Sequence, residues 1–134
     1  MKIGTEENFI ELEIQLDCRN GLPSDGDALI GIVVSSNGYC GKNQVWVSEP
    51  NLGAFGRAIL ELEKNRKGEA ILTSISPGEL YLRVYAYTGF GHIAIEGETG
   101  YCVAGPVGFF HSVKFGFAIE SEQLVKMSKI KWRL

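Results

Sequence analysis

Residues 9–18 read Phe9-Ile10-Glu11-Leu12-Glu13-Ile14-Gln15-Leu16-Asp17-Cys18. From Ile10 onwards every second side chain is apolar and the side chains between them are polar. Successive side chains of a β-strand point to opposite faces, so this pattern predicts a strand with one buried face and one face in water. A strand of this kind is typical of an antiparallel sheet.

The sequence after this strand repeats strand and turn signals around one helical segment. Ser35-Ser36-Asn37-Gly38 predicts a tight hairpin turn, because Asn-Gly tolerates the positive φ angles that such turns need. Helical spacing of apolar residues predicts a helix from Asn51 to Lys67, and a short closing helix begins near Ser121. The other predicted strands are Ile30–Val34, Tyr39–Val47, Glu69–Ser74, Leu80–Tyr87, His92–Glu98 and His111–Ile119.

Short turns between consecutive strands favour antiparallel neighbours, since parallel pairing needs a long crossover. The sequence therefore predicts an α+β fold. It consists of an antiparallel sheet with one main helix packed on one face and a short C-terminal helix. No linker or repeat interrupts residues 1–134, which predicts a single domain.

The helix ends carry capping residues. Asn51 and Ser121 are the predicted N-terminal caps, because their side-chain oxygens can accept a hydrogen bond from a free backbone N–H of the first turn. Gly68 is the predicted stop of the main helix. The predicted core consists of Leu12, Ile14, Leu16, Phe55, Ile59, Leu62, Leu82 and Phe117.

Composition narrows the functional classes. The formal net charge is −3, and the Lys and Arg residues form no long basic stripe, so we expect no nucleic-acid partner. No apolar run is long enough to cross a membrane, and the first residues lack the apolar core of a signal peptide. Cys18, Cys40 and Cys102 are widely spaced, which predicts three reduced, mostly buried thiols and a cytoplasmic protein.

The sequence contains no motif of a nucleophilic serine, a phosphate-binding loop or a helical metal site. We therefore expect no enzymatic activity, no catalytic residues, no cofactor and no metal. His92 follows a glycine turn, where a hydrogen bond that fixes the turn is its expected role. Pairing of His92 with a Cys102 thiolate stays open, because such pairs meet in space rather than along the chain.

Two sets of outward residues are candidates for binding a protein partner. Acidic side chains at outward strand positions either keep a sheet soluble or attract a basic protein. Tyrosine and arginine side chains are enriched at the energetic centres of protein interfaces, although they can equally cover an open sheet face. The candidate partner-binding residues are Glu11, Glu13, Tyr81, Arg83, Tyr85, Glu96 and Glu98.

Several short motifs follow one another between Leu29 and Leu124. They are Gly38-Tyr39-Cys40-Gly41, Val45-Trp46-Val47, the helix residues Phe55, Leu60 and Leu62, Gly68-Glu69-Ala70 with Leu72, Ser76-Pro77-Gly78-Glu79-Leu80, Gly91-His92-Ile93, Glu96-Gly97 and Phe115-Gly116-Phe117. In this order they resemble the WapI-type immunity proteins, which protect bacteria from polymorphic toxins. The closing segment departs from the family pattern, because Glu122 stands in place of the family's Asp and Leu124 follows Gln123 directly.

The resemblance implies a non-enzymatic protein that binds and neutralises a cognate toxin, and such toxins are often nucleases. An acidic net charge suits a basic toxin. Two alternatives stay open at this point. One is a small-molecule-binding or enzymatic α+β domain with a pocket between sheet and helix. The other is an accessory module that forms a homodimer.

Overall fold

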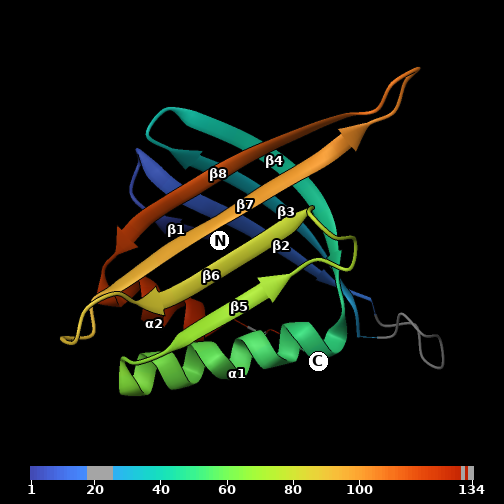
Figure 1. Ribbon diagram of the computed structural model, residues 1–134. Helices are drawn as coiled ribbons and strands as arrows, with labels where there is room; N and C mark the ends of the chain where they lie inside the picture. Colours follow the sequence, from blue (N-terminus) through green and yellow to red (C-terminus); the bar gives the residue numbers. More distant parts are fainter. Residues whose placement is uncertain (18–25, 131, 133–134) are drawn as a thin grey trace.

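The computed structural model describes residues 1–17, 26–130 and 132. Its strands form two antiparallel sheets of four strands each, joined by the main helix (Figure 1). Sheet A comprises β1 (Lys2–Gly4), β2 (Asn8–Leu16), β3 (Ala28–Ser36) and β4 (Tyr39–Val47). Sheet B comprises β5 (Glu69–Thr73), β6 (Leu80–Ala86), β7 (Ile93–Val103) and β8 (Phe109–Ile119). The helices are α1 (Glu49–Asn65) and α2 (Ser121–Ser128).

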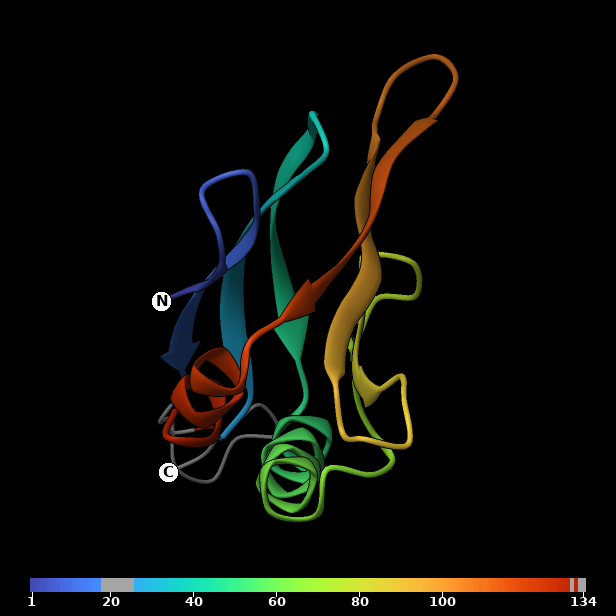
Figure 2. The ribbon, with the colours of Figure 1, turned by 90° about the vertical axis from the view of Figure 1, so that its left-hand side faces the viewer.

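The two sheets face one another, and their strands cross rather than run side by side (Figures 1 and 2). Each sheet is a meander in sequence order, so its register follows from consecutive hairpins. Helix α1 lies at one end of the space between the sheets, alongside β5, and α2 lies beside it (Figure 2). The α+β class with antiparallel pairing is confirmed. The division of the strands into two sheets was not predicted.

One hydrophobic cluster fills the space between the two sheets and the helices. The predicted core positions Leu12, Phe55, Ile59, Leu62 and Leu82 are buried in it. The remaining three, Ile14, Leu16 and Phe117, are only partly buried and pack against the cluster. In β8 the buried aromatic side chain is Phe115. Next to it the Gly116 carbonyl accepts a hydrogen bond from the Ser36 hydroxyl of sheet A at 3.4 Å.

The hairpin turn between β3 and β4 has the predicted conformation. Asn37 and Gly38 have φ angles of 50° and 85°, which is the geometry that an Asn-Gly turn supplies. The resulting register pairs Ser36 with Tyr39 and aligns all of β3 with β4.

Both predicted helix caps are wrong, that of α1 by three residues and that of α2 by one. Ser48 caps α1, since its hydroxyl accepts a hydrogen bond from the Asn51 backbone N–H, and Pro50 lies in the first turn. Glu120 occupies the N-cap position of α2 without a side-chain cap. The Ser121 hydroxyl instead accepts a 2.9 Å hydrogen bond from Arg66, the residue in left-handed conformation that ends α1.

The thiols also differ from the expectation. Cys40 and Cys102 are both exposed, because they lie near strand ends that extend beyond the core, whereas Cys18 lies outside the described residues. Among the described residues, no helix combines the length and apolar character needed to cross a membrane.

Candidate binding groove on the outer face of sheet A

The seven candidate residues lie on two different outer faces. Tyr81, Arg83 and Tyr85 project from β6, and the register places Glu98 opposite Tyr81 and Glu96 opposite Arg83 on β7. These five residues therefore share the outer face of sheet B. Glu11 and Glu13 lie on β2, in sheet A. Since the outer faces of two packed sheets point away from each other, one flat partner surface cannot cover both sets.

Two carboxylates on the sheet B face form ion pairs within the protein. Arg83 donates hydrogen bonds to Glu69 at 2.5 Å and to Glu96 at 2.8 Å. Its guanidinium carbon lies 3.9 Å from the centre of the Tyr85 ring. The hydrogen bonds to Glu96 and Glu69 raise the pKa of Arg83 further, so the group stays charged. This arrangement ties β5, β6 and β7 together, and a basic partner would have to compete with Arg83 for both carboxylates.

Tyr81 is the most exposed of the three candidate side chains on β6. It separates two hollows on the sheet B face, with volumes of about 440 Å3 and about 310 Å3, and Glu98 lines both of them. Lys114 on β8 lies directly opposite Glu98 in the register. Opposite charges at such a cross-strand position attract one another, which reduces the net charge of this face.

The outer face of sheet A contains a groove of about 410 Å3 that includes both of the other candidates. It runs across β2, β3 and β4, and one side chain from β7 closes it. The groove is lined by Glu11, Glu13, Gly31, Ile32, Val33, Lys42, Asn43, Gln44 and Tyr101.

The register of sheet A explains the shape of the groove. Gly31 lies between Glu13 on β2 and Gln44 on β4, so the middle of this row has no side chain. The neighbouring row places Val33 between Glu11 and Lys42. The missing side chain at Gly31 therefore leaves a depression, and the two carboxylates stand along one wall of it.

Glu11 and Glu13 are both exposed, and within the described residues neither forms an ion pair or a side-chain hydrogen bond. Lys2 lies directly opposite Glu11 in the register, and Lys42 also lines the groove, so the two carboxylates are near cations but not paired with them. Glu11 and Glu13 are two residues apart on one strand, so their Cα atoms lie about 6.6 Å from each other. Two carboxylates at this spacing can accept hydrogen bonds from both sides of a guanidinium or an ammonium group. The groove is thus suited to a basic side chain.

Tyr101 was not predicted as a binding residue. It lies at the base of the β7–β8 hairpin, and its ring contacts the His111 ring with centroids 6.3 Å apart. The side chain reaches the edge of β4 from sheet B and lines the groove in sheet A. An exposed tyrosine that lines the same groove as two carboxylates adds a surface on which a cation can stack. Only the crossing of the two sheets brings it there, and strand alternation carries no signal of that crossing.

Asn43 fixes the position of Tyr101 relative to β4. Its side-chain amide donates hydrogen bonds to the Gly100 carbonyl at 2.8 Å and to the Thr99 hydroxyl at 3.2 Å. Thr99 is 3% exposed, and its hydroxyl donates to the Glu79 carbonyl at 2.7 Å. These bonds connect sheet A with the base of the hairpin that carries Tyr101.

Replacing Asn43 with alanine is expected to lower the free energy of unfolding by about 1–3 kcal/mol, because the substitution leaves polar groups between the sheets without a partner. Urea denaturation measures the change. Gln44→Ala is the matched control, since Gln44 is the exposed neighbour on the same strand. A loss no larger in Asn43→Ala than in Gln44→Ala would contradict this role of Asn43.

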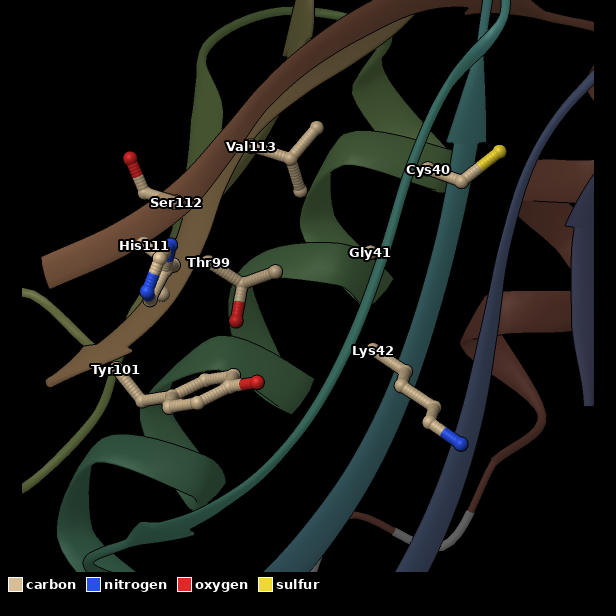
Figure 3. Close-up of a pocket in the computed structure, with 9 residues that line it drawn as sticks. Cys40, Gly41, Lys42, Thr99, Tyr101, His111, Ser112 and Val113 are labelled. Atoms are coloured by element: carbon tan, nitrogen blue, oxygen red, sulfur yellow. The ribbon is translucent and has the colours of Figure 1, made fainter. Parts of the chain in front are cut away.

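A further cavity, of about 300 Å3, lies between β4 and the β7–β8 hairpin (Figure 3). His111, Tyr101 and Thr99 are on its sheet B side, and the Cys40 side chain points away from His111 (Figure 3). The Cys40 thiol contacts the Ser35 hydroxyl instead, at 3.6 Å. No nucleophile and base are therefore brought together here.

His92 has the role that its position predicted. Its Nδ1 atom lies 3.1 Å from the Thr88 hydroxyl, and its backbone N–H donates to the same oxygen, so both contacts fix the turn before β7. Cys102 lies near the other end of the same strand, about 30 Å away at the usual rise per residue. The structure therefore does not form a His92–Cys102 pair. Among the described residues, no three metal-ligating side chains cluster.

Comparison of the chain with protein-family models, with curated proteins and with solved structures found no match.

Proposed function

We propose that this protein is a non-enzymatic immunity protein that binds a cognate bacterial toxin through the groove on sheet A. The observation that supports this proposal is the presence of two carboxylates that form no ion pair among the described residues, Glu11 and Glu13, in a groove that the exposed Tyr101 ring also lines. A toxin that acts on nucleic acid carries basic side chains where it binds phosphate. A basic side chain of the toxin enters the groove. The nucleic-acid substrate of the toxin can then no longer reach that side chain.

The groove is preferred over the sheet B face for an electrostatic reason. Arg83 already forms ion pairs with the two carboxylates that it contacts, so a basic partner would have to compete with it. Glu11 and Glu13 require no such exchange. The small-molecule alternative expected a pocket between sheet and helix. The four cavities of about 300–440 Å3 described above are lined by strand and turn residues, and α1 contributes to none of them.

The test is binding to the protein encoded by the neighbouring gene, measured by stopped-flow kinetics over a range of salt concentrations. In the double variant Glu11→Lys with Glu13→Lys, association is expected to slow by at least about tenfold at low salt. The rate should also lose most of its salt dependence, because the attraction between opposite charges is removed.

Two further variants separate an effect of the groove from an effect of net charge and from an effect of the sheet B face. Glu120→Lys with Glu122→Lys makes the same change in net charge at exposed positions that do not line the groove. It should alter association far less. Tyr85→Ala tests the sheet B face, since loss of an interface anchor shortens the lifetime of a complex. A large effect of Tyr85→Ala with none in the groove variant would move the site to sheet B, and failure of the neighbouring protein to bind would remove the immunity proposal.

A further inference from the structure

The end of the β7–β8 hairpin projects beyond the other strands of both sheets and forms an arm, at the top of Figure 2. We define the arm as residues Tyr101–Ser112. Every residue in it is exposed, and none of them is Asp, Glu, Lys or Arg. Charged residues make up 22% of the chain, so an exposed stretch of this length without any is unusual for a surface that only meets water.

The arm exposes large apolar side chains. Tyr101, Phe109 and Phe110 are 44%, 62% and 53% exposed, and Val103 and Val107 are exposed beside them. An aromatic side chain has about 150–250 Å2 of surface, so these three rings present about 300 Å2 to solvent. The valines enlarge the patch. An apolar patch of this size is typical of an interaction surface.

The arm also has a free strand edge. Within the described residues β8 pairs only with β7, so its other edge has unpaired backbone N–H and C=O groups. Natural edge strands are commonly protected from pairing by a lysine, a proline or a bulge. The arm portion of β8, Phe109–Ser112, has no lysine and no proline. This edge is open to another strand.

We propose that two copies of this chain associate through their arms, with the β8 edges paired antiparallel about a twofold axis. A second copy fits because antiparallel pairing about such an axis places the uncharged arm segments opposite each other, so no like charges meet. The exposed ring surfaces of two arms add up to about 600 Å2. The valines and strand edges bring the total towards the roughly 1,000 Å2 of a specific interface.

This interface goes beyond the proposed toxin-binding function, and it shares only Tyr101 with the groove. The test therefore uses Phe109, which does not line the groove. Sedimentation velocity of the full chain, from low micromolar to submillimolar concentration, should show a reversible monomer–dimer equilibrium. In Phe109→Lys the dissociation constant should rise at least about tenfold, because the change removes an exposed ring and places a charge on the strand edge.

Phe90→Lys is the matched control. Phe90 is 91% exposed, and it lies in the turn between β6 and β7, outside the arm. The Phe90→Lys variant should dimerise as the unmodified chain does. Both lysine variants should unfold at the same temperature as the unmodified chain, since neither ring is buried. Hydrogen exchange gives a second reading: amides of residues 109–113 should exchange more slowly as protein concentration rises. A chain that stays monomeric at submillimolar concentration, or equal weakening by both lysine variants, would overturn the proposal.

Discussion

Replacing Phe55 with alanine is expected to lower the free energy of unfolding by about 3–5 kcal/mol, as for other large core side chains. Phe55 is 1% exposed and lies on the face of α1 that meets the core. Its ring meets the Trp132 ring edge to face, with centroids 5.0 Å apart. The substitution therefore removes contacts both with the sheets and with the end of the chain.

The expected loss is a large part of the 5–15 kcal/mol that a domain of this size typically has. Urea denaturation followed by far-ultraviolet circular dichroism measures it. Phe90→Ala removes the same ring from a site that is 91% exposed, and it should change the stability by less than about 0.5 kcal/mol. A loss below about 1 kcal/mol in Phe55→Ala would contradict the placement of this ring in the core.

The sequence predicted the local structure of this chain well, because strong local patterns control it. The alternation after Phe9 predicted β2 and its buried face, and Asn37-Gly38 predicted the turn that sets the register of β3 and β4. The stripe from Leu52 to Leu62 predicted the buried face of α1. Each of these signals depends on residues that are close in sequence.

The division into two sheets has no local signal. Alternation tells which side chains point inwards, but an inward residue looks the same whether its strand belongs to one sheet or to either of two. The 3-residue strand β1 was missed for a related reason, since Lys2-Ile3-Gly4 is too short to show a period. The caps were misplaced because Ser48 and Asn51 are both good capping residues and only the backbone decides between them.

The candidate site was predicted in part. Alternation correctly placed the acidic residues on outer faces, but it did not show that Arg83 would hold Glu69 and Glu96. The distinction between unpaired and ion-paired carboxylates depends on the pairing of β5, β6 and β7, which is a tertiary property. Tyr101 was missed for the same reason, since it comes to line the same groove as Glu11 and Glu13 only through the crossing of the sheets.

The structure also predicts that Gly97 cannot be replaced, although it lies in the middle of a strand, where glycine is usually unfavourable. A Cβ atom at this position would collide with the Tyr81 backbone carbonyl oxygen and would lie 2.9 Å from the Phe115 ring. The carbonyl belongs to the neighbouring strand, so β6 and β7 would have to move apart. Gly97→Ala is therefore expected to lower the free energy of unfolding by about 1–3 kcal/mol or more.

Gly116 provides the matched control, because it lies in the next strand and faces the outside of sheet B. A Cβ atom there would be 3.6 Å from the Glu96 Cβ atom, which is an ordinary contact. Gly116→Ala should leave the stability unchanged or raise it by about 0.4–1 kcal/mol, because alanine has less freedom than glycine in the unfolded chain. Urea denaturation of both variants tests the difference. Equal stability would show that β6 and β7 leave room for a methyl group at Gly97, and that the close packing of Phe115 over this strand is not required.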